Sequence, residues 1–236
     1  MEDFFNQSEN VIPHIGDQAP AFRSVTTQGT IYFPGDYLGK WVILFSYPTY
    51  FSTIYTSEFM AFTCMYDDFK AINCELIGLQ VDRLHSQIAG LSSIKEKPEY
   101  KGMKDVEMKF PLIDDITMEV ARKYGIIQPD ESNSKVFRAV FFIDPECIIR
   151  AIIYYPLSIS LNFDELKRII VALQTADAFR VNTPTDCHIG DEVILSPANS
   201  YSIAEERFES KKEDKKYTEW FFCTKELSEE KVMNVN

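Results

Sequence analysis

Two apolar segments constrain the fold of this chain most, because neither leaves room for a face that contacts water. They are KWVILFSYP (residues 40–48) and CELIGLQVD (residues 74–82). The continuous apolar run WVILF in the first segment is typical of a strand that is buried on both faces of a sheet, and the second segment reads as another buried strand. Between the two segments, apolar residues recur at helical spacing, namely Phe59, Phe62, Tyr66 and Phe69. Strand, helix and strand in this order predict an α/β fold, with a helix near Thr56 or Ser57 following the first strand.

The remaining segments add hairpins and helices to this centre. Alternation around Gln28-Gly29 predicts a β-hairpin over residues 21–33. Residues 136–156 read as two strands joined by a turn at Asp144-Pro145. We expect helices at residues 84–97, at 116–125 with an end at Gly125, and at 162–179 with Asn162 as the cap.

The composition changes near residue 180. The segment NTPTDCHIGDEVILSPANS is rich in turn formers, and ESKKEDKKYTEW (residues 209–220) is a charged run typical of a solvated helix end or loop. We therefore expect a core domain at residues 1–178 and an extension at residues 179–236 without a core of its own.

Charge and hydropathy exclude several classes of partner. The net charge of −12 repels phosphate, which argues against binding to nucleic acid or to an anionic membrane surface. No apolar run reaches the roughly 18 residues that a membrane-spanning helix needs. The first residues, MEDFFNQSEN, are acidic and polar rather than basic and then apolar, so we expect no secretory signal and a cytoplasmic protein.

The cysteines suggest neither a disulfide framework nor a metal site. There are five of them, widely spread, and no pair has the CxxC spacing. Cys187 and His188 are adjacent, which is poor geometry for joint ligation of a metal. We expect no metal and no cofactor.

Several motifs occur in an order that resembles one known family. They are IGDQAPAF (15–22), GKWVILFS (39–46), ELIGLQVD (75–82), RAVFFIDPE (138–146), NFDELKR (162–168), ALQTAD (172–177), IGDEVILSP (189–197) and EWFFC (219–223). In this order they resemble a peroxiredoxin of the alkyl hydroperoxide reductase/thiol-specific antioxidant family, most closely the 1-Cys type and its archaeal relatives. The resemblance implies a thioredoxin-like sandwich, in which helices flank a mixed central sheet, with a C-terminal dimerisation arm. It also implies a homodimer or a higher ring.

The reactive segment of that family reads His-Pro-x-Asp-Phe-Thr-Pro-Val-Cys-Thr-x-Glu, and here the same frame reads YPTYFSTIYTSE (residues 47–58). By resemblance, the family-equivalent pocket consists of Pro48, Ser52, Tyr55, Glu58 and Arg138. The resemblance assigns Ser52 to orienting the peroxide and Arg138 to lowering the thiol pKa. The peroxidatic cysteine itself falls on Tyr55. The shielding proline is Thr53, and a further family arginine is Leu161.

The replacement of sulfur by a phenol changes the chemistry. A thiolate attacks the O–O bond of a peroxide and passes through a sulfenic acid to a disulfide. A phenol has a reference pKa of about 10, and a helix terminus lowers it by roughly 1.5 units at most. Even as an anion, an aryl oxide attacks an O–O bond poorly and cannot follow the sulfur route. The sequence therefore predicts a peroxidase scaffold that is catalytically degenerate, a pseudoenzyme among antioxidant oxidoreductases.

Three functions remain open. In the first, the degenerate scaffold serves assembly, with an active peroxiredoxin paralogue as one candidate partner. In the second, another cysteine, Cys64 or Cys223, carries out a thiol-dependent peroxidase reaction; the resemblance aligns Cys223 with a resolving cysteine of archaeal relatives. In the third, the old pocket binds a ligand behind an aromatic wall of tyrosines, namely Tyr47, Tyr50 and Tyr55. Arg138 either lines a remnant of the pocket or pairs with Glu58. Tyr55 fills space, contacts a ligand or takes part in radical chemistry.

Overall fold

The computed structural model describes residues 12–47, 53–81, 88, 107–127, 137–203, 205, 215–219 and 222–233. The chain divides into two compact units, residues 1–161 and residues 162–236. The expected boundary after residue 178 stays a prediction, and the helix that precedes it falls within the second unit.

A mixed sheet of seven strands forms the centre of the first unit, with the order β2-β1-β5-β4-β3-β6-β7. Its strands are β1 (Phe22–Thr26), β2 (Gly29–Phe33), β3 (Trp41–Tyr47), β4 (Cys74–Gln80), β5 (Leu112–Asp114), β6 (Arg138–Ile143) and β7 (Ile149–Tyr155). The three central strands β3, β4 and β5 are parallel, and the other pairs are antiparallel. A short 3-10 helix, η1 (Gly35–Tyr37), follows β2. This is the expected thioredoxin-like arrangement.

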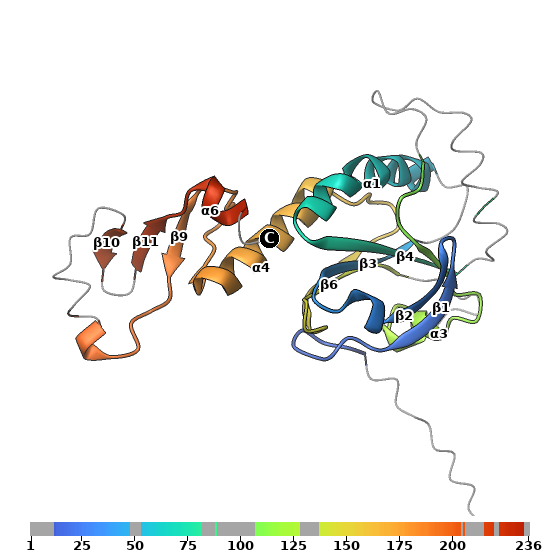
Figure 1. The fold of residues 1–236 in the computed structure, drawn as a ribbon, viewed down its shortest axis with the longest axis horizontal. Coiled ribbons are helices and arrows are strands. Elements are labelled where there is room, and N and C mark those ends of the chain that lie inside the picture. The colour runs from blue at the N-terminus through green and yellow to red at the C-terminus, as the bar shows by residue number, and fades with distance from the viewer. Residues whose placement is uncertain are drawn as a thin grey trace, which may run out of the picture. The chain divides into compact units, whose positions relative to one another are not determined.

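Helices cover both faces of this sheet, which explains the continuous apolar strands. Figure 1 shows α1 (Thr53–Ala71) along one face, over β4 and β3, with α3 (Glu119–Lys123) on the opposite side. On the α1 face the ring of Phe45 stacks on Phe62, with 4.0 Å between centroids. On the α3 face Val42 and Leu44 belong to the same buried cluster as Tyr124. The prediction of a strand buried on both faces is confirmed.

The structure confirms the first hairpin and shortens one helix. Thr26 pairs with Gly29 across the predicted turn. The helix expected over residues 116–125 is only α3, because Asp115 accepts the backbone N–H groups of Val120 and Ala121, at 3.1 and 2.7 Å, and so fixes the start of the helix there. α1 begins at Thr53, three residues before Thr56. The helix expected at residues 84–97 lies outside the described residues except for Ile88, which is helical.

Gly125 follows α3 in the left-handed region, with φ of +63°, where a side chain is strained. A Cβ there would lie 2.8 Å from Cγ2 of Ile12. We expect Gly125→Ala to lower the free energy of unfolding by about 1–3 kcal/mol, measured by urea denaturation. Gly39→Ala is the control, because Gly39 has φ of +79° but a Cβ added there would meet no atom within 4 Å. Equal losses in the two variants would show that the contact with Ile12 contributes nothing.

The second unit has a small antiparallel sheet with the order β10-β11-β9-β8. Its elements are α4 (Phe163–Phe179), β8 (Val181–Asn182), β9 (Glu192–Leu195), β10 (Lys215–Glu219), β11 (Phe222–Glu226) and α6 (Glu229–Met233). Asn162 Oδ1 accepts the N–H of Glu165 at 3.1 Å, which confirms the predicted cap. The expectation of a loop or helix end was wrong for residues 215–219, because pairing with β11 makes them a strand. Buried Val193, Cys223 and Leu227 also give this unit a core.

Among the described helices, none is both long and apolar enough to cross a membrane.

Candidate functional site

The site is built where α1 and the start of β6 meet. Ser46, near the end of β3, ties β3 to the start of β6: its hydroxyl donates to the carbonyl of Phe137 and accepts the N–H of Ala139 at 2.8 Å. These bonds flank Arg138, the first residue of β6. The side chain of Arg138 is therefore held in a defined place under the first turns of α1.

Arg138 and Glu58 form a buried ion pair. Arg138 Nη1 donates to Glu58 Oε1, and the two side chains are only 1% and 2% exposed. The backbone N–H of Leu161 donates to the same carboxylate oxygen at 2.7 Å. Of the two interpretations of Arg138, pairing with Glu58 is confirmed, while its role in lining a pocket remains a prediction.

The charges of this pair cancel, but its hydrogen bonds are incomplete. Burial raises the pKa of Glu58, and the charge of Arg138 and the Leu161 N–H act against that rise. Within the part of the chain that the structure describes, Arg138 Nε and Nη2 and Glu58 Oε2 are buried without a hydrogen-bond partner. No described cysteine sulfur therefore accepts a hydrogen bond from Nε or Nη2. The site holds one positive and one negative charge, with donors left over.

The rest of the family-equivalent pocket is only partly described. Pro48, Tyr50 and Ser52 lie outside the described residues. Tyr55 is the third residue of α1, in its first turn, and its side chain lies outside the described residues, as does that of Tyr47 at the end of β3. The structure thus brings together Glu58 and Arg138, and the contribution of the other residues remains a prediction.

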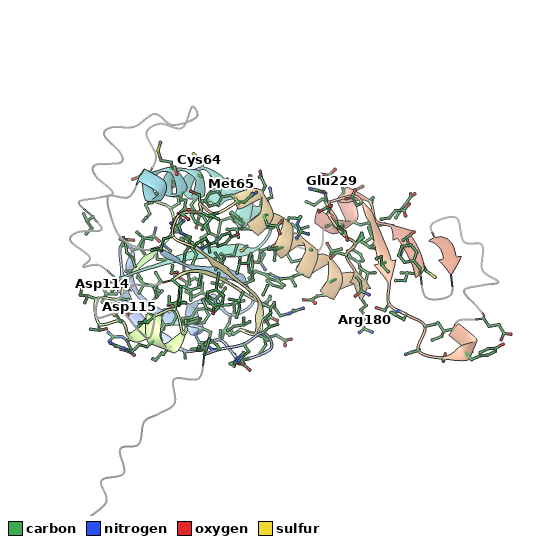
Figure 2. All side chains as sticks on the ribbon, turned by 180° about the vertical axis from the view of Figure 1, so that it is seen from behind. Cys64, Met65, Asp114, Asp115, Arg180 and Glu229 are labelled. Atoms are coloured by element: carbon green, nitrogen blue, oxygen red, sulfur yellow. The ribbon has the colours of Figure 1, made fainter. Side chains whose placement is uncertain are left out.

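Neither candidate redox cysteine joins this pair. Figure 2 shows Cys64 on the outer side of α1, where its side chain is exposed. Six residues before it on the same helix, Glu58 is buried, and this spacing turns the two side chains about 120° apart. Cys223 is fully buried in β11 of the second unit.

The other three cysteines are expected to react slowly as nucleophiles. Cys74, Cys147 and Cys187 are buried, and burial raises the pKa of each thiol, so they are protonated near neutral pH. All five cysteines are free thiols. Across the described residues, no group of three or more His, Cys, Asp or Glu side chains is placed to hold a metal ion.

Sequence reasoning missed two contributors to the site. Ser46 was read only as part of an apolar strand, although a single hydroxyl in a run of buried apolar residues is a usable signal, since it must find a partner. Leu161 was noted only for the arginine that it replaces. Its backbone N–H, which binds Glu58, has no signature in sequence.

Comparison with known proteins identifies the scaffold. The AhpC/TSA family model matches residues 15–152, more than half of the chain. The chain belongs to the AhpC/TSA family. A peroxiredoxin of Methanosarcina mazei is 51% identical over 214 residues, which cover 91% of this chain and 98% of the relative. A peroxiredoxin of Thermotoga maritima is 43% identical over 223 residues, 93% of this chain and 100% of the relative.

Solved peroxiredoxins have the same fold. The yeast mitochondrial 1-Cys peroxiredoxin superposes with a TM-score of 0.78 at 31% identity, covering 92% of this chain and 100% of that one. A cysteine-to-serine variant of peroxiredoxin 6 from Arenicola marina gives a TM-score of 0.79 at 26% identity, covering 91% and 98%. The chain thus has the thioredoxin-like peroxiredoxin fold, the scaffold of antioxidant peroxidases, over nearly its whole length.

Proposed function

We propose that this peroxiredoxin has lost the peroxidase reaction and acts in the cytoplasm as an assembly-forming scaffold, as a homodimer or ring or together with an active peroxiredoxin. The observation that carries the proposal is Tyr55, in the first turn of α1 where the family frame has its cysteine. A phenol there cannot be oxidised to a sulfenic acid and reduced again. Five free thiols fit a reducing compartment.

The charges of the buried pair support the loss. Arg138 already shares its charge with Glu58, so the pair is neutral. Leu161 stands where the resemblance places a second arginine, and its buried side chain brings no charge. A second buried anion, such as a thiolate, would therefore have no cation of its own. The cysteine and the second arginine are missing together, as expected if the arginine served the thiolate.

The two substitute cysteines are poorly suited to the reaction. Cys64 is exposed, and the pair of Glu58 and Arg138 is buried. Cys223 has no exposed surface, so a peroxide cannot reach it without local opening of the second unit. Both features favour the degenerate scaffold over a peroxidase with a relocated nucleophile.

The direct test is a peroxide-consumption assay. Purified wild-type protein with hydrogen peroxide and a dithiol reductant is expected to consume peroxide no faster than the reductant alone. Sulfenic acid trapping with dimedone, followed by peptide mass spectrometry, shows whether any cysteine reacts. Cys64→Ser and Cys223→Ser variants serve as controls. Peroxide turnover by the wild type that is lost in either variant would refute this proposal and support a peroxidase that uses Cys64 or Cys223 as its nucleophile.

Assembly is tested separately by sedimentation velocity. We expect the full chain at micromolar concentration to sediment as a dimer or a larger assembly. Mixed assembly with an active peroxiredoxin predicts in addition that the chain co-sediments with the Methanosarcina mazei peroxiredoxin. A monomer at these concentrations would refute the assembly role and leave the loss of activity standing.

A further inference from the structure

The second unit contains a cavity of about 460 Å³. Its walls come from four separate parts of the unit: one face of α4, the loop of residues 183–191, β9 and the segment of residues 227–232. This volume lies within the range of about 300–1,000 Å³ that is usual for small-molecule sites. Walls on several sides suit a compact molecule better than the flat surface of another protein.

The wall of the cavity is mainly apolar. The buried side chains in it are Val171, Thr175, Cys187, Val193, Leu227 and Val232. Ala172 and Ile189 extend the apolar surface. An apolar occupant would make dispersion contacts with these wall atoms and so stabilise the unit.

The charged side chains around the cavity balance in number, and Arg168 and Asp191 are engaged in hydrogen bonds. Two acids, Asp164 and Asp191, and two bases, Lys167 and Arg168, belong to the lining. Arg168 Nε and Nη2 donate to the two carboxylate oxygens of Glu165 at 2.6 and 2.9 Å. Asp191 Oδ2 accepts the backbone N–H of His188 at 2.7 Å. Since the whole chain carries −12, charge complementarity disfavours an anionic ligand and fits an uncharged one.

We propose that this cavity binds an uncharged, largely apolar small molecule, held between α4 and the loop that carries Cys187 and Ile189. The Cys187 thiol forms part of the wall, and its Sγ lies 3.6 Å from the carbonyl oxygen of His188. Burial raises the pKa of this thiol, so the wall is neutral at that point too. The inference goes beyond the proposed function, since it concerns the other unit and needs no peroxide chemistry.

The test compares two fluorescent probes that share the same ring system. We expect N-phenyl-1-naphthylamine, which is uncharged, to bind the full-length chain saturably with one site per chain. Its sulfonated relative, 8-anilino-1-naphthalenesulfonate, is expected to bind at least tenfold more weakly. Equal affinity for the two probes would overturn the argument from charge, and absence of saturable binding would overturn the site.

Two variants of α4 locate the binding. Ala172→Trp fills the cavity and is expected to weaken binding of the uncharged probe at least tenfold. Ala178→Trp makes the same change at an exposed position outside the lining and is expected to leave binding unchanged. Equal binding by the two variants would place the probe elsewhere and overturn the proposal.

A second measurement does not depend on the folding of Ala172→Trp. In the wild-type chain the uncharged probe is expected to slow the reaction of Cys187 with 4,4′-dithiodipyridine at least fivefold, and to leave that of exposed Cys64 unchanged, as read by peptide mass spectrometry. Unprotected Cys187 would refute the site. If the probe binds only after the assembled protein is diluted to monomers, a second copy of the chain fills the cavity. That result would also refute the small-molecule site.

Discussion

A Tyr55→Cys/Leu161→Arg double variant is expected to consume hydrogen peroxide about 10- to 25-fold faster than Tyr55→Cys alone at pH 7. The new thiol would stand in the first turn of α1, close in sequence to Glu58, whose partner Arg138 has two nitrogens without a described hydrogen-bond partner. These donors favour a thiolate. However, Glu58 already balances the charge of Arg138, so a thiolate would give the buried site a net negative charge.

The size of the gain follows from the second cation. Opposite charges about 4 Å apart, at an effective dielectric constant of about 20, attract by about 4 kcal/mol, and one pKa unit corresponds to about 1.4 kcal/mol. Even two-thirds of that attraction lowers a thiol pKa from about 8.5 to about 6.5. The thiolate fraction at pH 7 then rises from about 3% to about 75%, which sets the expected ratio of rates.

The pH profile and two single variants test this reasoning. The rate of the double variant is expected to reach its plateau about two pH units below that of Tyr55→Cys, since the plateau follows the thiol pKa. Leu161→Arg in the Tyr55 background should remain inactive, because it supplies charge but no nucleophile. If Tyr55→Cys alone matched the double variant, the charge balance of the buried pair would not limit the chemistry.

The sequence predicted the centre of the fold because burial on two faces leaves a direct pattern in it. The apolar run WVILF at residues 41–45 fits little else than a central strand that is covered on both faces. Asn162 has a side-chain oxygen that can accept a backbone N–H at the start of a helix, as it does here. The limits of α3 were not predictable in this way, since they depend on Asp115, whose carboxylate accepts the backbone N–H groups five and six residues further on, and the hydropathy pattern does not show these bonds. Residues 215–219 form a strand although their charged sequence predicts a solvated helix end or loop, because their pairing with β11 outweighs the local propensity.

For the site, the sequence left two alternatives open for Arg138, and the structure decides for one of them. Arg138 and Glu58 are 80 residues apart, and the juxtaposition of β6 and α1 shows that they bind each other. The cavity in the second unit left no motif at all, because its wall joins single residues of α4 to Ile189 and Val232 across long separations. The assignment of Tyr55 to the position of the family's cysteine rests on the sequence alone, on the residues that match the family on either side of it, and it stays a prediction.

Arg138→Met is expected to lower the free energy of unfolding by about 3–5 kcal/mol at pH 7, one of the largest single-residue losses available in this chain. The substitution leaves Glu58 as a buried carboxylate whose remaining described hydrogen bond is the Leu161 N–H. The Glu58→Gln/Arg138→Met double variant removes both charges and keeps an acceptor for that N–H. It should lose about 1–2 kcal/mol, so the two single changes do not add. Urea denaturation of the wild type, Arg138→Met, Glu58→Gln and the double variant gives the coupling free energy between the two side chains. A double variant as unstable as Arg138→Met would contradict this expectation.

The pH dependence of the same variants separates charge from packing. Burial raises the pKa of Glu58 above its ordinary value of 4.5, so between that value and the raised one the folded state binds more protons than the unfolded state. The stability that comes from protonated Glu58 is therefore complete below about pH 4.5 and is lost as the pH rises through the raised pKa. Arg138 holds this rise in check, and Arg138→Met removes that restraint. The loss caused by Arg138→Met should thus be at least about 1 kcal/mol smaller at pH 5 than at pH 7, and should not vary with pH when Glu58→Gln is the background, because no titrating carboxyl remains at the site.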